Sequence, residues 1–349
     1  MSLALSSGGF GGAGGMAGFL SALDLFFGAR PVTAIGHYTG VSAGSIIASF
    51  LAAGISPLDL VKTLSGAADN EVRGWRPADL YRPNLAELAP TAARALRAAL
   101  RRLGLGAEPA GEIGVLPSGV LSLDGVVANA RDNLARRGVT RFSDLSRRLG
   151  IIFYDVLSNT RVVAGNGPGE IDLPIAEAIA ASAAIPGVFP PRRIDLGDRS
   201  VLGVDGGTGG YRIGVRDLDD VDLVIAYNHA GFAPVEGRVH HVSAPAVVGM
   251  SLQLSVNQSN IDEIASWIDA HPEAHAWVFQ PPPRQLSSTL SYAGIFEGAR
   301  ECYELAQRWL GEHLDYFGTV LANHGVTVDP DFARVRFDDV VAHGSAVKA

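Results

Sequence analysis

A serine between two glycines could act as a nucleophile in this chain. Ser42 stands in the stretch Gly40-Val-Ser-Ala-Gly44, with a glycine two residues away on each side. In a nucleophile elbow, a serine on a sharp strand-to-helix turn exposes its hydroxyl, and glycines at these two positions remove collisions in the strained turn. The pattern therefore predicts attack by the Ser42 hydroxyl on an ester, with a covalent acyl-enzyme as the intermediate.

The residues on either side of Ser42 predict the elements that an elbow needs. Val32–Ile35 is a short β-branched and apolar run, which we expect to be a buried strand. Ser45–Ala53 is a run of small and apolar residues, which we expect to be a helix. The N-terminus of this helix would present free N–H groups to an oxygen that arrives near Ser42.

A glycine-rich stretch precedes the elbow. Ser6–Gly15 separates a predicted strand, Ser2–Leu5, from a predicted apolar helix, Met16–Phe27. A loop of this kind exposes backbone N–H groups to an anion, and a β-α-β unit would bring it beside Ser42. The loop is therefore a candidate oxyanion hole, and the alternative is that its small residues serve close helix–strand packing. It lacks the Lys-Ser/Thr ending of a Walker loop.

Composition limits the other classes. The chain is 47% hydrophobic with a mean hydropathy of +0.19, so a sizeable core is available, yet no apolar run is long enough to span a membrane. The net charge of -8 argues against nucleic acid as a partner, and the single Cys302 excludes an internal disulfide. The N-terminus lacks the basic region of a signal peptide. We expect a cytoplasmic protein, at most peripheral to a membrane, that needs no metal or cofactor.

Strands alternate with helices along the chain, and this order predicts an α/β fold with a mostly parallel sheet. From Gly325 onward we expect at most one short strand. The other predicted strands are Gly150–Leu157, Thr160–Ala164, Val201–Val204, Val221–Tyr227 and Ala276–Phe279, and the other predicted helices are Ser56–Ala67, Thr91–Leu103, Leu123–Arg136, Pro174–Ser182, Pro245–Ala270 and Gly294–Tyr316.

The segment 73–148 differs from the rest in charge. It holds thirteen arginines against seven acidic residues, inside an acidic protein. Within it, the predicted helix Thr91–Leu103 places Leu96, Leu100 and Leu103 on one stripe with arginines beside it. This helix could meet anionic lipid at a membrane surface, and the alternative is an ordinary surface helix over the core.

Four stretches taken together resemble one known family. In chain order they are Gly8–Gly12, Gly40–Gly44, Ala181–Pro190 and Asp205–Gly207. Their types and order resemble the patatin-like phospholipase family, with a similarity that runs from about Leu3 to about Tyr227. The resemblance implies a three-layer α/β sandwich, with a catalytic domain over 1–320, a lid-like helical insertion over 73–148 and a C-terminal tail over 321–349.

The resemblance also implies a Ser–Asp dyad that hydrolyses esters of phospholipids and related lipids. Asp205 would be the general base for Ser42, with no histidine. A carboxylate is a weak base near its ordinary pKa of about 3.9, and partial burial would raise that pKa. Asp205 could instead be a turn residue, because Asp-Gly-Gly is good turn chemistry. The implied oxyanion-hole residues are Gly8, Gly9, Phe10 and Gly11, and the supporting glycines are Gly40, Gly44, Gly206 and Gly207.

Two departures from the family pattern leave alternatives open. Phe10–Gly12 stands where many members carry Arg or Lys, so the identity of the oxyanion donors is open. After Asp205–Gly207, Thr208-Gly-Gly-Tyr replaces a more usual continuation that contains Asn and Pro. This departure leaves open the pocket on the acceptor side of the site, and it does not affect the dyad. Three other functions remain: an acyltransferase that uses the same acyl-enzyme, a Ser-His-Asp esterase of the α/β-hydrolase type, and a non-catalytic lipid-binding protein.

Overall fold

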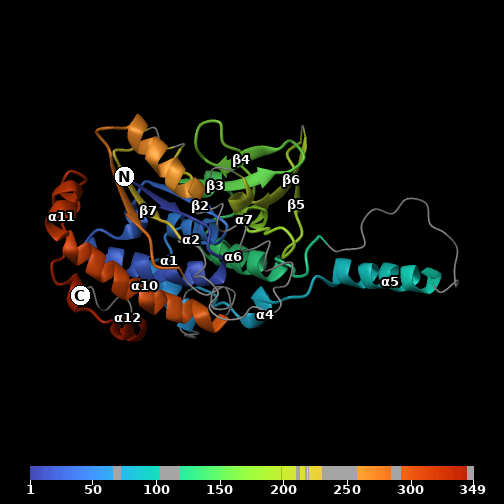
Figure 1. Cartoon of the computed structure of the whole chain (residues 1–349). Coiled ribbons are helices and arrows are strands. Elements are labelled where there is room, and N and C mark those ends of the chain that lie inside the picture. Colours follow the sequence, from blue (N-terminus) through green and yellow to red (C-terminus); the bar gives the residue numbers. More distant parts are fainter. Residues whose placement is uncertain are drawn as a thin grey trace.

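One eight-stranded sheet runs through the described residues and carries helices on both faces (Figure 1). The structure is a computed structural model that describes residues 1–65, 72–102, 118–197, 199–209, 213–216, 218, 220–229, 258–283 and 292–343. The strand order is β5-β6-β3-β2-β1-β7-β8, and β4 pairs with β3. The strands are β1 (Ser2–Leu5), β2 (His37–Val41), β3 (Arg148–Asp155), β4 (Thr160–Gly165), β5 (Arg192–Asp195), β6 (Ser200–Asp205), β7 (Leu223–Tyr227) and β8 (His275–Phe279).

The sheet is parallel on one side and antiparallel on the other. The pairings β1–β2, β1–β7, β2–β3 and β7–β8 are parallel, whereas β3–β4, β3–β6 and β5–β6 are antiparallel. The mostly parallel α/β sheet is therefore confirmed. The predicted strands after residue 150 are also found, and β5 is a strand that the sequence did not predict.

Alternating side chains of the central strands divide the core into two layers. Leu3 and Leu5 of β1 belong to the large hydrophobic core on one face of the sheet. Ala4, between them, packs on the other face in a small cluster with Ile264 and Trp267 of the helix over 258–270. Because successive side chains of a strand point to opposite faces, helices cover both, and the three-layer arrangement is confirmed.

The glycine-rich stretch after β1 is mostly helix and not loop. The helix α1 (Gly9–Phe26) begins at Gly9, so the prediction of a loop through Gly15 is wrong. A Cβ at Gly14 or Gly18 would overlap the backbone carbonyls of Ile295 and Ala299 in α10 (Tyr292–Glu312). Glycines destabilise the interior of a helix, but here they let the backbones of α1 and α10 touch. The close packing of the two helices offsets that loss of stability.

The strand before the elbow was also placed wrongly. Val32–Ala34 is a 3₁₀ turn, and the strand that leads into Ser42 is β2. The Val32 N–H donates to the buried carboxylate of Asp24 at 2.7 Å, and the Tyr38 hydroxyl donates to the Val32 carbonyl at 2.8 Å. These bonds keep the apolar run outside the sheet, although its composition resembles that of a strand.

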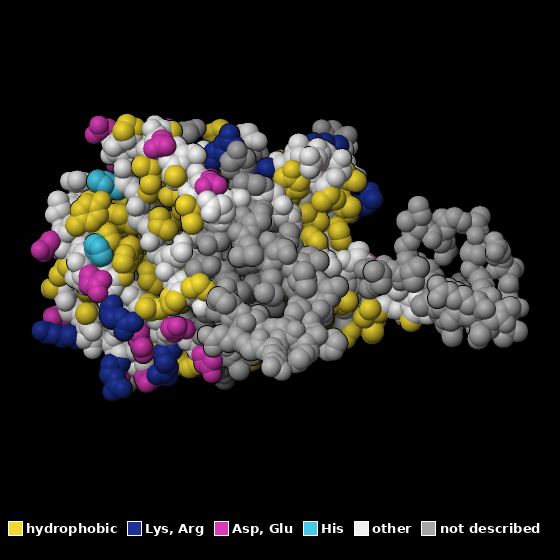
Figure 2. All heavy atoms as spheres, in the orientation of Figure 1, with side chains coloured by type: hydrophobic (Ala, Val, Ile, Leu, Met, Phe, Trp, Pro, Cys, Tyr) yellow, Lys and Arg dark blue, Asp and Glu magenta, His cyan; other side chains and the backbone are white. Residues whose placement is uncertain are grey.

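The C-terminal region is more helical than predicted. The single helix expected over Gly294–Tyr316 is divided at His313 into α10 and α11 (Leu314–Ala322), so the expected boundary at residue 320 falls within α11. Beyond Gly325 the described residues contain α12 (Phe337–His343) and no strand. On the face seen in Figure 2, charged side chains gather over these helices at the lower left. An ion pair of 2.6 Å between Arg300 and Asp338 links α10 to α12.

The remaining predicted helices are present with shifted ends. α5 contains Pro90 and begins before the predicted start at Thr91, and in Figure 1 it extends away from the rest of the chain. The predicted residues Ala67, Leu103 and 245–257 lie outside the described part. In that part, no helix is both long and apolar enough to cross a membrane. After α1, the chain forms the helices α2 (Ala43–Ala52), α3 (Pro57–Ser65), α4 (Pro77–Leu80), α5 (Leu85–Arg102), α6 (Asp124–Arg136) and α7 (Ile175–Ser182).

Candidate active site

Ser42 occupies a strained turn between β2 and α2. Its φ of 53° and ψ of -121° are rare for a residue with a side chain, and a conformation of this kind costs about 1–3 kcal/mol. The residue is 3% exposed. A Cβ at Gly40 would overlap the carbonyl oxygen of Gly44, and a Cβ at Gly44 would overlap that of Leu5. The two glycines therefore allow the close backbone approach that the turn requires.

A buried serine outside the predicted set of site residues fixes the backbone of this turn. The Ser42 N–H donates to Ser182 Oγ at 2.8 Å, and the same hydroxyl donates to the Ile152 carbonyl at 2.7 Å. On the other side, the Ser45 hydroxyl donates to the Ser42 carbonyl at 2.6 Å. Ser182 is 0% exposed at the end of α7. Ser182 belongs to the Ala181–Pro190 stretch, which is one of the motifs that resemble the family. Its hydrogen bonds to Ser42 and Ile152 depend on the fold, so the motif alone does not predict them.

The pairing around β3 brings Ser42 and Asp205 to the same place. Residues 150–155 of β3 pair with β4 along one edge, so β2 and β6 must share the other edge. Val41 is opposite Ile152, and Asp205 is opposite Phe153, the next residue of β3. β2 and β6 thus run toward each other and turn away where they meet. Ser42 and Asp205 lie at this meeting point.

Local contacts support the same placement of Asp205. A Cβ at Gly206 would lie 3.0 Å from Val41 Cγ1, so the two turns touch. Asp205 is 5% exposed, and its N–H donates to the Ala184 carbonyl at 2.9 Å. Its Oδ1 accepts the Gly207 N–H at 2.8 Å. The carboxylate is thus buried and oriented at the candidate site.

A second carboxylate holds β6 against β3. Asp155 Oδ1 accepts the N–H groups of Leu202 at 2.9 Å and Leu157 at 3.1 Å, and Oδ2 accepts the Ser158 hydroxyl at 2.5 Å. Burial alone would raise the pKa of Asp155, but these hydrogen bonds outweigh burial and lower it from the ordinary value. Ionised Asp155 therefore fixes the strand that ends at Asp205.

The predicted oxyanion-hole residues lie at the N-terminus of α1. The first α-helical bond runs from the Gly12 N–H to the Gly8 carbonyl at 2.9 Å. The N–H groups of Gly9, Phe10 and Gly11 therefore precede it, in the turn where helices leave donors without intrahelical partners. Gly9 and Phe10 line the same cavity as Ser42. The N-terminal turn of α1, the positive end of that helix, and Ser42 thus line one space.

The cavity is apolar apart from the serine. It has an empty volume of about 630 Å³, counting the part that opens to solvent. The described residues that line it carry no charged side chain, and they include Ala43 and Ile46 of α2 and Leu60 of α3. Such a lining suits the burial of an apolar group beside the serine hydroxyl.

Contacts of two described histidines place them relative to the candidate site. His275 lies at the start of β8, at the opposite end of the sheet from Ser42, and bonds to the Tyr316 hydroxyl at 3.1 Å. His229 follows β7 on the same side as the site, and its ring packs against Gly8. His240 and His241 lie outside the described residues. Among the described residues, no group of three or more His, Cys, Asp or Glu could hold a metal ion.

The fold and this site define an α/β protein with a serine on a strand-to-helix elbow. A family model, the patatin-like phospholipase model, matches residues 3–217, and the chain belongs to this family. No curated protein matches the sequence. Among solved structures, VipD from Legionella pneumophila is similar, with 14% identity, a TM-score of 0.36 and coverage of 93% of this chain and 78% of that one. ExoU, in complex with SpcU from the type III secretion system of Pseudomonas aeruginosa, has 17% identity, a TM-score of 0.29 and coverage of 100% and 68%.

Proposed function

We propose that this protein is a serine lipid acyl hydrolase that cleaves carboxylic esters of phospholipids or other acyl lipids. The observation that carries the proposal is the meeting of Ser42 and Asp205 where β2 and β6 end, beside an apolar cavity. The family membership supports a lipid substrate. A nucleophile, an acceptor for its proton and donors for the oxyanion are the parts that ester cleavage requires.

In the proposed mechanism the Ser42 hydroxyl attacks the ester carbonyl and passes its proton to the Asp205 carboxylate. The N–H groups of Gly9 and Phe10, with those of Gly8 and Gly11 as further candidates, stabilise the negative oxygen of the tetrahedral intermediate. The leaving alcohol takes the proton from Asp205 as the acyl-enzyme forms. Water then repeats these steps on the acyl-enzyme, which releases the fatty acid and restores Ser42.

The test replaces the nucleophile. Ser42→Ala should reduce hydrolysis of p-nitrophenyl octanoate by about 10⁴-fold or more, because the covalent step is lost. A fluorophosphonate probe should label the wild-type protein at Ser42 and leave the variant unlabelled. Circular dichroism and thermal melting should show an unchanged fold. Turnover that survives in the variant, or a wild-type protein that the probe does not label, would refute the proposal.

An acyltransferase is the second candidate, because the same acyl-enzyme could react with an alcohol instead of water. Its cleavage step would look identical in the assay above. Adding lysolipid or glycerol as an acceptor separates the two: a hydrolase continues to release free fatty acid, and a transferase diverts the acyl group into a new ester.

We extend the proposal to a peripheral membrane contact through residues 91–103. α5 extends away from the sheet in Figure 1, and it contains Arg94, Arg97 and Arg101. If α5 meets anionic lipid, reversing these three charges should weaken sedimentation with phosphatidylglycerol vesicles and leave hydrolysis of a soluble ester unchanged. Equal vesicle binding by the two proteins would reject this contact and leave the hydrolase proposal standing.

A further inference from the structure

Trp75 lines the cavity that contains Ser42, although it comes from a different part of the chain. It lies in the segment 72–76, just before α4, and it is 8% exposed. Its indole is the largest side chain of the cavity lining. In a closely packed interior, a side chain of this size decides how much space remains for a ligand.

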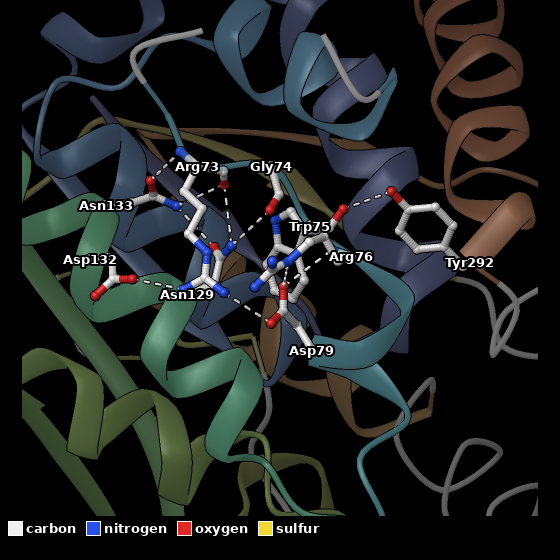
Figure 3. A network of polar contacts seen from close by, with 9 residues as sticks. All are labelled: Arg73, Gly74, Trp75, Arg76, Asp79, Asn129, Asp132, Asn133 and Tyr292. Carbon is white, nitrogen blue, oxygen red and sulfur yellow. Dashed lines mark hydrogen bonds and ion pairs between the residues drawn. The ribbon is translucent and has the colours of Figure 1, made fainter. Parts of the chain in front are cut away.

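Hydrogen bonds from α6 hold the backbone just before Trp75 (Figure 3). Asn129 Nδ2 donates to the carbonyls of Arg73 and Gly74, both at 3.2 Å. Asn133 accepts the Arg73 N–H at 2.6 Å and donates to the Arg73 carbonyl at 3.2 Å. Both asparagines are almost fully buried, so their amides fix this backbone in a place that water does not compete for.

Contacts from two other elements complete this network around Trp75. The Tyr292 hydroxyl of α10 donates to the Trp75 carbonyl at 2.7 Å. The Arg73 guanidinium bonds to Asp79 at 3.0 Å and to Asp132 at 2.7 Å, and Asp79 is 5% exposed. Backbone groups on both sides of the indole are therefore bonded to neighbouring helices.

The network makes Trp75 a fixed wall of the cavity. Moving this backbone away from the cavity would break buried hydrogen bonds to α6 and α10 and leave their partners unsatisfied. Val126 of α6 and Leu123, the residue just before that helix, also line the cavity, so α6 contributes to the wall as well as to the network. The space beside Ser42 is therefore set by a rigid part of the fold.

The length of the cavity indicates what it could hold. Its lining on α1 extends from Gly9, beside the serine, to Ala17. At 1.5 Å per residue this distance along the helix is about 12 Å. An extended acyl chain of medium length matches this distance, and a longer chain extends past the part of the cavity that α1 lines.

We propose that Trp75 is a specificity-determining residue that favours acyl groups of medium length over longer ones. This inference rests on the proposed hydrolase function and adds the acyl-chain preference to it. The chain would lie against the indole, with its carbonyl at Ser42. A longer chain would meet the indole, whose backbone the network around Arg73 holds at the cavity wall.

The test compares chain lengths within one variant. Trp75→Ala and Trp75→Phe are assayed with monomeric p-nitrophenyl butyrate, octanoate, dodecanoate and hexadecanoate. Each methylene that becomes buried raises kcat/KM about fourfold, which is ~0.8 kcal/mol. Trp75→Ala should therefore raise the dodecanoate-to-octanoate ratio of kcat/KM by about tenfold or more, and Trp75→Phe should raise it less. The ratio does not depend on the fraction of folded protein, so a loss of stability alone leaves it unchanged.

A filling variant tests the opposite direction. Ala17→Leu, at the far end of the α1 lining, should lower the octanoate-to-butyrate ratio several-fold. Trp267→Phe, in the core on the other face of the sheet, is the matched control and should leave all ratios unchanged. Ratios in Trp75→Ala that stay within twofold of the wild type would overturn the inference. Activity that survives Ser42→Ala would instead overturn the hydrolase function, so the two failures are distinguishable.

Discussion

Two parts of the same cavity are held in place by different means. At the proposed catalytic edge, where Ser42 and Asp205 meet, close backbone contacts dominate: Gly40 and Gly44 permit contacts that no other residue could make, and the Ser182 hydroxyl adds a bond to the Ser42 N–H. At the cavity wall, the segment 72–76, side chains of α6 and α10 reach over to bind an ordinary backbone. The first arrangement tolerates almost no change of residue, and the second distributes its stability over several replaceable bonds.

This difference explains what the sequence could predict. The catalytic edge depends on glycines at fixed spacing around Ser42, so it appears as a local motif. The cavity wall depends on pairs such as Arg73 with Asn133, which are 60 positions apart, and Trp75 with Tyr292, which are 217 apart. No local pattern marks such pairs. The sequence therefore led to the expected nucleophile and base and missed the wall that would select the substrate.

The errors in the fold have a similar origin. Gly14 stands in a stretch with the composition of a loop, but it lies within a helix. Glycine is needed there because the backbone of α10 occupies the place where a side chain would be. Val32 looks like a strand residue, but the buried Asp24 carboxylate caps its N–H and a 3₁₀ turn results. In both places a tertiary contact outweighs the local propensity. Parallel strands such as β7 were predicted because burial on both faces makes them continuously apolar.

The largest effect is expected when the proposed catalytic edge loses its proposed proton acceptor, Asp205. Asp205→Asn keeps the shape and the hydrogen bond from the Gly207 N–H, but it removes the carboxylate. We expect kcat for p-nitrophenyl octanoate to fall by about 10³-fold, which is within the usual range for general base catalysis. Thermal melting should show that the variant is folded.

Histidine variants decide between a dyad and a triad. His229→Asn changes the imidazole that packs against Gly8, and His275→Asn changes the one at the opposite end of the sheet. Under the Ser–Asp mechanism both variants keep most of the activity. A collapse in His229→Asn with an active Asp205→Asn would favour the histidine-based alternative.

An intermediate effect is expected for the bond that holds the elbow. Ser182→Ala leaves the Ser42 N–H and the Ile152 carbonyl without their shared partner, in a place with no exposure to water. An unsatisfied buried group costs about 1–3 kcal/mol. Because the lost hydrogen bond displaces the Ser42 backbone from its position in the elbow, kcat should drop about 10- to 100-fold, while KM stays near the wild-type value.

A matched control for this variant lies in α2. Ser49 is also 0% exposed, and its hydroxyl bonds to the Ser45 carbonyl inside the helix at 2.6 Å. Ser49→Ala should affect stability more than kcat. If Ser182→Ala and Ser49→Ala lower kcat equally, Ser182 is a general packing residue and the elbow does not depend on its hydrogen bond.

The smallest effect on chemistry is expected at the cavity wall, where two neighbouring residues offer a matched pair. Asn133 is 1% exposed and exchanges two hydrogen bonds with the Arg73 backbone, whereas the side chain of Asp132 is 51% exposed and pairs with the Arg73 guanidinium. Asn133→Ala should lower the free energy of unfolding by about 1–3 kcal/mol, because buried partners lose their bonds. Asp132→Ala should lower it by about 1 kcal/mol or less, because an exposed ion pair contributes little.

Catalysis by these two variants tests whether wall and edge are independent. If the bonds that hold the wall are separate from those that hold the edge, kcat for p-nitrophenyl butyrate should stay within about twofold of the wild type in both variants. In Asn133→Ala the loosened Trp75 should shift the preference toward longer esters, in the same direction as Trp75→Ala but less far. Urea unfolding and the ester series measure the two quantities separately. A tenfold loss of kcat on butyrate in a stably folded Asn133→Ala protein would show that the wall positions the nucleophile as well, and the distinction between the two regions would fail.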